Sequence, residues 1–557
     1  MKAPFSFAQC VLVWAIAATA HPSNGGGQLP LQLPQIAAQS TGSWNTPPHP
    51  DATHNHLFNQ VNSLMKRWPN TIYRNGHAIV AATIPTGTIL YHGRTNSSVP
   101  NQPEWLGFDF EHSYLFCWNS CFVMSIMATR DLHLAYFDGT SAANLQDGTL
   151  DSQDIVIWGE RRTDKFFSEY ERINELCKWG RPLGVDGFVR MEFHFEVLLC
   201  DFTDGVEVVS ISNVLPKHMP ATRPRMPPPG RDSDFPPPPP PPHDIIPHRA
   251  APFVAPPTRR PFPQPDPPPN WKGSLPDAGS ITFEALVAGS WHNTAPGETR
   301  VRVDYARVVS FYDPALSSLV EARRGLPRAG HHLGNLSTAD SQKVRAELAE
   351  VFARRGGGSG VDWGSVTRVV VERYADRLEL LRYLLAPARY PNATEQAALV
   401  RKQLLTALAP YITVDTVPTA DCAKSNTSWA APIVERCATT QTGRILDHTL
   451  TEQERLIRDA VEGTLREACR RLTGMWVEAF DIERETDMRK REVLQAFATE
   501  VEELMTWLDW SVWVKCRPEC NPDQMCYIPS WFFYYWLDKD PNDMTPRCIS
   551  KLETSSF

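Results

Sequence analysis

The chain has 557 residues, of which 42% are hydrophobic and 21% are charged, and its formal net charge at pH 7 is −8. This length and apolar content are sufficient for two folded domains, each with its own core. Because the charge is only mildly negative and no block of lysine or arginine occurs, the composition excludes nucleic-acid binding through a basic surface.

Residues 1–20 predict a signal peptide. Lys2 is followed by an apolar run, and Ala18-Thr19-Ala20 has the small residues of a cleavage site. No later segment is long and apolar enough to predict a membrane span. We therefore expect a secreted, extracellular protein that begins with a flexible segment over 21–53. Four sequons predict a glycoprotein, at Asn96, Asn335, Asn392 and Asn426.

Residues 54–217 predict a strand-rich α+β domain. Apolar residues at helical spacing predict helices over 57–68 and 166–179. Short runs rich in Val, Ile, Tyr and Phe, bounded by turn residues, predict strands. These runs are 77–84, 87–93, 104–110, 132–138 and 187–202.

Residues 218–273 are dominated by proline, which fixes φ and removes a backbone donor. The segment therefore predicts an extended polyproline linker between two domains. A docking site for SH3-like or WW-like domains is the alternative.

Residues 274–557 predict a mainly α-helical domain with a Cys/Trp-rich tail. Asp362 is placed to cap a helix that extends to about Leu385, and Thr451 with Glu454 forms a capping-box pattern for a second helix. A third helix carries an apolar face from Leu494 to Leu508.

The tail predicts a disulfide-stapled cap. It contains Cys516, Cys520, Cys526 and Cys548 without the paired C-x2-C turns of a zinc ribbon, so no metal is predicted. The pairing of these cysteines cannot be deduced from their spacing. Five tryptophans accompany them, and they indicate either the core of the cap or a carbohydrate-binding surface: Trp507, Trp510, Trp513, Trp531 and Trp536.

The first domain holds the residues that indicate chemistry. His92 ends a predicted strand beside Gly93, which is a suitable position at the edge of a cleft. In the predicted strand 187–202, alternation places Glu192, His194 and Glu196 on one face. Such a face either lines a cleft or is exposed to solvent.

The order of these motifs resembles the mono-ADP-ribosyltransferase fold of the His-Tyr-Glu type. The matching segments are LYHG, the element around Ser113-Tyr114, the strand RDLHLAYFD, and DGFV followed by EVLLCD. The resemblance implies that His92 contacts the ribose of NAD, that Tyr114 beside Ser113 stacks on nicotinamide, and that Glu196, or failing it Glu192, is catalytic. It implies NAD as a substrate and a protein or small molecule as acceptor.

Two other functions compete with a transferase. The chain also resembles two-domain secreted proteins of filamentous fungi, a resemblance that implies no activity and agrees with a non-catalytic extracellular or cell-wall interaction protein. Alternatively, Asp138 and Asp151 could serve as the carboxylate pair of a glycoside hydrolase. Turn formation explains these two aspartates equally well.

Overall fold

The structure is a computed structural model that describes residues 44–117, 120–145, 148–216, 275, 278–354, 356–386, 390–417, 427–529 and 544–552. The predicted signal peptide and the proline-rich segment lie outside the described residues. The chain divides into two compact units. The sheet unit comprises 49–375, 444–461 and 508–557, and the helical unit comprises 1–48, 376–443 and 462–507.

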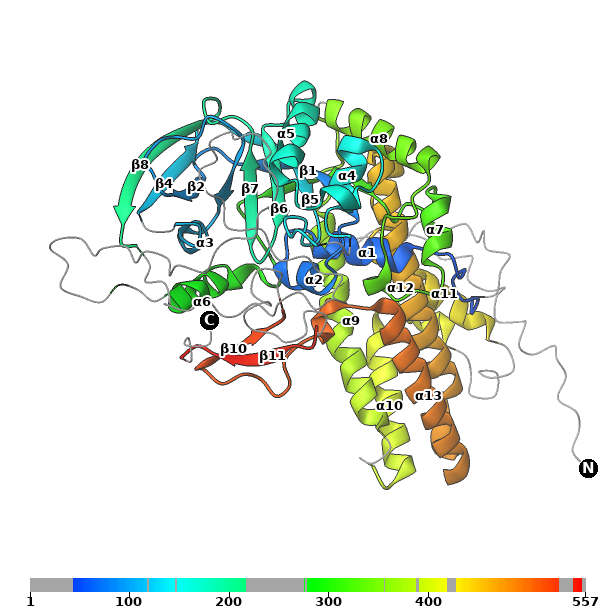
Figure 1. The fold of residues 1–557 in the computed structure, drawn as a ribbon. Coiled ribbons are helices and arrows are strands. Elements are labelled where there is room, and N and C mark those ends of the chain that lie inside the picture. Colours follow the sequence, from blue (N-terminus) through cyan, green and yellow to red (C-terminus); the bar gives the residue numbers. More distant parts are fainter. Residues whose placement is uncertain are drawn as a thin grey trace, which may run out of the picture. The chain divides into compact units, whose positions relative to one another are not determined.

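A nine-stranded sheet forms the centre of the sheet unit, in the order β8-β4-β2-β3-β7-β6-β5-β1-β9 (Figure 1). All neighbouring strands are antiparallel except β5 and β6, which are parallel. The bounds are β1 Ala78–Ile84, β2 Ile89–Arg94, β3 Glu104–Gly107, β4 Cys121–Ala128, β5 Leu132–Phe137, β6 Gly187–Met191, β7 Phe195–Leu199, β8 Val206–Val214 and β9 Arg302–Ser310. The predicted strand-rich α+β region is confirmed.

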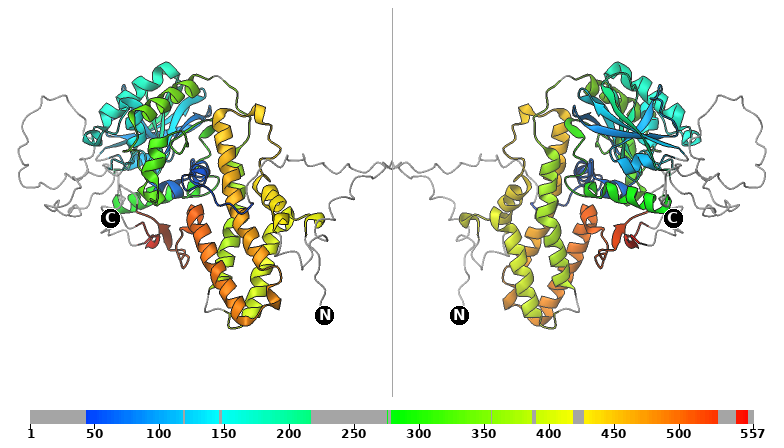
Figure 2. Two further views of the ribbon diagram at one scale, coloured as in Figure 1. Left: turned by 90° about the vertical axis from the view of Figure 1, so that its right-hand side faces the viewer. Right: turned by 90° about the vertical axis from the view of Figure 1, so that its left-hand side faces the viewer.

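One face of this sheet carries a large hydrophobic core. Strand residues such as Ile79, Phe137 and Leu198 pack against side chains of four helices. These helices are α4 (Asp151–Trp158), α5 (Glu169–Gly180), α7 (Ser317–Arg323) and α8 (Thr338–Ala353). Figure 2 shows α5 and α8 lying against the same side of the sheet. The helix predicted over 166–179 is α5, which begins three residues later.

The sheet does not end where the sequence predicts. Strand β9 follows the proline-rich segment, yet it pairs with β1 through Ala78–Ser310 and Ile79–Val309. Strand β1 is almost completely buried, so both of its edges need hydrogen-bonding partners. The prediction of a first domain confined to 54–217 is therefore wrong, because a strand from the second half completes its sheet.

Long helices dominate the second half of the chain, as predicted. They are α9 (Trp363–Leu385), α10 (Ala393–Leu408), α12 (Glu452–Glu478) and α13 (Asp487–Leu508), with the shorter α11 (Ala431–Ala438) beside them. Both predicted N-terminal caps form. Asp362 accepts a 3.0 Å hydrogen bond from the amide of Ser365. Thr451 and Glu454 exchange bonds of 3.0 and 3.2 Å.

Five disulfides occur among the described residues: Cys117–Cys121, Cys177–Cys200, Cys437–Cys469, Cys516–Cys526 and Cys520–Cys548. The last two confirm the predicted disulfides of the tail. Cys516–Cys526 joins β10 (Gln524–Tyr527) to the segment before it, and Cys520–Cys548 joins β11 (Arg547–Ser550) to the same segment. The two strands pair with each other through their backbones. Within the described part of the chain, no helix is long and apolar enough to cross a membrane.

The described tail tryptophans contribute to packing. Trp510 is 3% exposed and stacks on Phe58 and on Trp513, at ring-centre distances of 6.1 and 5.2 Å. Trp531 and Trp536 lie outside the described residues. Trp510 is therefore buried against Phe58. The two interpretations of the tail tryptophans, the core of the cap and a carbohydrate-binding surface, both stay predictions.

Candidate metal centre

A short helix, α3 (Phe110–Tyr114), lies directly on the strands β2 and β3 because two glycines make room for it. A Cβ atom at Gly93 would come within 2.1 Å of the Ser113 carbonyl oxygen. A Cβ atom at Gly107 would come within 2.7 Å of Ser113 Oγ. Gly107 also pairs with Glu196 of β7, so α3 lies over that glutamate.

The strands β6 and β7 are joined by a tight turn at Glu192, Phe193 and His194. The amide of Glu192 donates a 3.1 Å hydrogen bond to the carbonyl oxygen of His194. The predicted single strand over 187–202 is thus a hairpin, and Glu192 and His194 belong to its turn. Both side chains are buried, as is that of Glu196, so a solvent-exposed face is excluded for these three residues.

Helix α2 (Arg67–Ile72) holds this turn next to a second segment, the short 3-10 helix Ser290–His292. The Arg67 side chain donates to the carbonyl oxygen of Phe193 and, at 3.0 Å, to Oδ1 of Asn293. Asn293 in turn accepts a 3.0 Å hydrogen bond from the amide of Trp68. These contacts fix His194 and His292 relative to each other.

Two neighbouring sets of residues could bind metal ions. We call the first set the histidine–aspartate group; it consists of Asp109, His194 and His292. One ligand atom of each residue lies within 4.8 Å of the others. Asp109 Oδ2 is 3.9 Å from both His194 Nδ1 and His292 Nε2. These separations are too long for hydrogen bonds. Atoms that are each about 2.1 Å from one zinc ion lie roughly 3–4 Å apart.

Both histidine rings of this group are almost inaccessible to solvent, with side-chain exposures of 0% for His194 and 1% for His292. None of their four ring nitrogens makes a hydrogen bond of good geometry within the described residues. Burial lowers the pKa of His194 well below its ordinary value, while the nearby Leu286 carbonyl acts in the opposite direction. A neutral imidazole is the form that binds metals.

Two further charged residues adjoin the histidine–aspartate group. Glu298 Oε2 is 3.9 Å from His292 Nε2 and is held at 2.7 Å by Arg300. Arg300 also contacts Asp109 at 3.2 Å. Burial alone would raise the pKa of Asp109, but His292 and Arg300 lower it below its ordinary value. Asp109 is therefore an ionised carboxylate in a fixed position.

His112, Glu192 and Glu196 form the second set, which we call the histidine–glutamate group. Their ligand atoms also lie within 4.8 Å of one another, and all three residues are buried. Burial raises the pKa of both glutamates and lowers that of His112 to about 4. Arg190 contacts Glu196 at 2.8 Å and Glu169 at 2.7 Å.

An open pocket of about 480 Å³ adjoins the histidine–aspartate group. Asp109 and Arg300 belong both to its wall and to the surroundings of the two histidines. The other lining residues are Thr88, Ile89, Tyr91, Phe108, Phe110 and Glu111. A ligand in this pocket would therefore meet aromatic rings, one guanidinium group and the carboxylates of Asp109 and Glu111.

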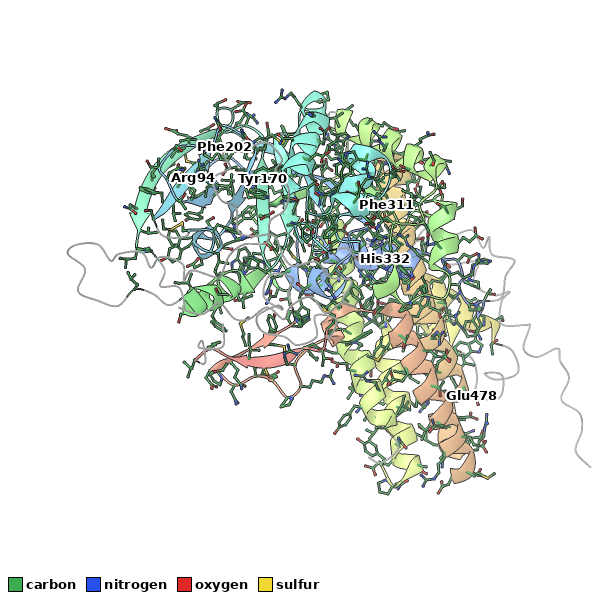
Figure 3. All side chains as sticks on the ribbon, viewed as in Figure 1. Arg94, Tyr170, Phe202, Phe311, His332 and Glu478 are labelled. Atoms are coloured by element: carbon green, nitrogen blue, oxygen red, sulfur yellow. A yellow bond between two sulfur atoms is a disulfide. The ribbon has the colours of Figure 1, made fainter. Side chains whose placement is uncertain are left out.

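His92 does not converge with Glu196 as the transferase resemblance implies. Tyr91 pairs with Gly107, and Gly107 pairs with Glu196, so Tyr91 and Glu196 share one face of the sheet. His92, the next residue, points to the other face, where it contacts Glu104 at 2.8 Å. That prediction of convergence is wrong, because strand register cannot be deduced from one sequence. Figure 3 labels Phe202, whose ring centre lies 6.2 Å from that of His92.

Tyr114 and Ser113 are both engaged in packing. Ser113 Oγ donates a 2.7 Å hydrogen bond to the carbonyl oxygen of Tyr91. The Tyr114 hydroxyl donates to the carbonyl oxygen of Leu215, and its ring lies 5.8 Å from that of Phe110. Both side chains thus fasten α3 to the sheet.

Asp138 and Asp151 are held in different surroundings. Asp138 accepts 2.6 Å hydrogen bonds from the amides of His77 and Ala78, and burial raises its pKa to about 7. It lines a cavity of about 20 Å³ to which Asp151 does not contribute. Asp151 forms a 2.9 Å ion pair with Arg161. The two aspartates thus have different partners.

Sequence patterns identified Glu192, His194 and Glu196 but missed Asp109, His112 and His292. His112 stands in the segment quoted for the resemblance, without a role of its own. Asp109 and His292 lie on opposite sides of the proline-rich segment and form no spacing motif. The only available signal was the presence of histidines and acids beside predicted strand ends.

Comparison with known proteins finds similarity only to part of the chain. Residues 51–123 and 118–229 match a family model described as the YPL277C N-terminal domain. Two relatives from Saccharomyces cerevisiae, the uncharacterized proteins YOR389W and YPL277C, are each 31% identical to this chain. The alignments cover 28% of this chain and only 32% and 42% of those proteins. No solved structure matches.

The matched region contains Asp109 and both glutamates of the histidine–glutamate group, together with His112 and His194. His292, Glu298 and Arg300 lie beyond it.

Proposed function

We propose that the sheet unit binds a zinc-type divalent metal ion through Asp109, His194 and His292 and acts as a metal-dependent hydrolytic enzyme on a ligand in the adjoining pocket. The convergence of two buried histidine rings on one carboxylate carries the proposal. Burying polar ring nitrogens without hydrogen bonds costs free energy, about 1–3 kcal/mol per group. Coordination to a metal ion compensates for that cost.

The ligand types agree with such an ion. Two imidazoles and one carboxylate are a common three-ligand set for catalytic zinc, which keeps a fourth position for water. Glu298 is placed either to complete the coordination or to accept a proton from bound water, since its carboxylate is 3.9 Å from His292. The Leu286 carbonyl near His194 is the usual type of partner for the second nitrogen of a metal-binding histidine.

The position of Asp109 supports a catalytic rather than a purely structural ion. Its side chain is 14% exposed, whereas the two histidine rings are almost fully buried. Asp109 lines the open pocket, so an ion bound to it would be reached from that side. A metal-bound water there would be activated as a nucleophile, because the ion lowers its pKa towards neutrality.

Secretion is part of the same proposal. The five disulfides are typical of an oxidising compartment. Asn335 and Asn392 are exposed and Asn96 is partly exposed, which favours glycosylation at these sequons. The sequon at Asn426 lies outside the described residues.

The other functions have less geometric support. NAD binding stays a prediction, and the placement of His92 and Glu196 on opposite faces removes the geometry on which it was based. A glycosidase would need its two carboxylates in one pocket. The non-catalytic interaction protein is the function that remains if no metal ion binds.

Metal analysis of the secreted protein tests the proposal. We expect zinc to copurify, to be removed by a chelator and to rebind. His292→Gln should lose this ion, whereas His133→Ala, at an exposed position of β5, should retain it. Circular dichroism of each variant confirms that it is folded. A wild-type protein that neither contains nor binds a divalent ion would contradict the proposal.

A further inference from the structure

The histidine–glutamate group has more negative charge than its surroundings compensate. Three carboxyl groups interact electrostatically here, those of Glu169, Glu192 and Glu196. The cation that faces them is Arg190. When all three are ionised, one guanidinium group leaves two negative charges uncompensated. Buried charges are retained only when they are paired, protonated or bound to a metal ion.

We propose that His112, Glu192 and Glu196 bind a second divalent cation beside the first, so that the sheet unit contains a two-ion centre. A catalytic use of this second ion rests on the function proposed above, whereas the choice of its ligands does not. A divalent cation would neutralise the two remaining charges. The carboxylate oxygens of Glu192 and Glu196 and an imidazole nitrogen of His112 supply donors that suit manganese or zinc.

The imidazole of His112 is an observation independent of the acidic residues. The residue is 2% exposed, and its Nδ1 is buried without a hydrogen-bond partner in the described part of the chain. Its position is imposed by the close approach of α3 to Gly107, which pairs with Glu196. The backbone therefore holds a neutral imidazole directly beside the two carboxyl groups.

The two ligand groups are neighbours in both sequence and space. Asp109 and His112 are three residues apart at α3, and Glu192 and His194 belong to the same turn. The ring centres of His112 and His194 are 5.9 Å apart. In two-metal sites the ions lie about 3.5–4 Å apart and clamp both the attacking and the leaving oxygen of a substrate. The ligands here are close enough for such an arrangement.

Glu196 would keep its contact with Arg190 while it binds the ion. Arg190 Nη2 donates a 2.8 Å hydrogen bond to Oε1 of Glu196, and a carboxylate that accepts such a bond can also bind a cation. Arg190 is also held by Glu169 and is 1% exposed, so it orients the glutamate rigidly. Ligating carboxylates commonly have a second partner of this kind.

The number of bound ions per chain decides between one site and two. We would titrate the chelator-treated full-length protein with Mn²⁺ and with Zn²⁺ and measure bound metal after equilibrium dialysis. The wild type should bind two ions. Glu192→Gln and Glu196→Gln should each bind one. Glu171→Gln, an exposed glutamate of α5, is the matched control and should bind two.

The same titration separates this inference from the proposed function. If the wild type binds one ion that is lost in His292→Gln and retained in Glu192→Gln, the second site is overturned while the first stands. If the ion is lost in Glu192→Gln and retained in His292→Gln, the first site is overturned instead. A wild type that binds no ion contradicts both.

A metal-free measurement guards against variants that fail to fold. Glu192→Gln removes an uncompensated charge, so its melting temperature in chelator should be higher than that of the wild type. Added Mn²⁺ should then raise the melting temperature of the wild type more than that of the variant. Equal shifts in both proteins would overturn the second site.

Discussion

At the scale of single residues, the candidate site depends on Gly107, which lets α3 and its His112 lie close to Glu196. Strand alternation identified Glu192, His194 and Glu196, and all three are buried at the candidate site. Alternation could not predict that Glu192 and His194 belong to a turn. His92 was placed beside Glu196 because the two stand on neighbouring motifs, whereas the strand register separates them.

Gly107 gives a direct test of the packing that positions His112. In Gly107→Ala the new methyl group would come within 2.7 Å of Ser113 Oγ and displace α3. We expect the free energy of unfolding to fall by about 1–3 kcal/mol and metal binding to weaken. Gly474→Ala, in α12 with no atom near the new methyl, should be neutral or slightly stabilising. Urea denaturation of both variants measures the difference.

A buried histidine predicts a loss of stability in acid. Burial lowers the pKa of His331 from 6.5 to about 4, so the folded state binds fewer protons than the unfolded state below about pH 6.5. Its contribution is therefore present at pH 7 and is lost as the pH falls towards 4. The raised pKa of Asp138 acts in the opposite direction over the same range.

Because these effects overlap, His331→Gln should be compared with the wild type at each pH. From pH 7 to pH 5, the wild type should lose more stability than the variant, by roughly 1–2 kcal/mol. Guanidinium denaturation curves at the two values supply the comparison. If the free energy of unfolding falls by the same amount in the wild type and in the variant, His331 is not responsible for the loss.

At the scale of elements, the long helices, their caps and most strands were predictable from periodicity and turn residues. The division of the chain was not, because β9 is separated from its partner β1 by the proline-rich segment. The residue pattern of β9 is that of a strand, but the pattern does not identify the strand with which β9 pairs. Its pairing makes the two halves of the chain parts of one sheet.

This pairing predicts that the halves stay together after cleavage. If a protease site is introduced within 218–273 and cut, the two fragments should separate on a denaturing gel without reductant, because each described disulfide joins cysteines on the same side of the cut. They should nevertheless coelute in native size-exclusion chromatography. Fragments that elute separately under native conditions would contradict the β1–β9 pairing.

At the scale of the whole molecule, cysteine usage predicted the disulfides of the tail, although not their pairing. The two bridges join β10 and β11 to the segment that precedes them, and the two strands form a separate two-stranded sheet. Replacing Cys520 and Cys548 together by serine should lower the stability of the tail by roughly 2–5 kcal/mol. In this variant, backbone amide hydrogen exchange should be faster than in the wild type in β10 and β11 but not in β1. Equal protection of β10 and β11 in the variant and in the wild type would refute this role of the disulfide.

Metal binding by Asp109, His194 and His292 is the most important of these proposals. X-ray absorption spectroscopy of the zinc-loaded protein tests it most directly. We expect only nitrogen and oxygen neighbours at about 2.0–2.2 Å from the zinc ion, with the outer-shell scattering of imidazole reduced in His292→Gln. Sulfur neighbours at about 2.3 Å, or a spectrum without imidazole scattering, would contradict it.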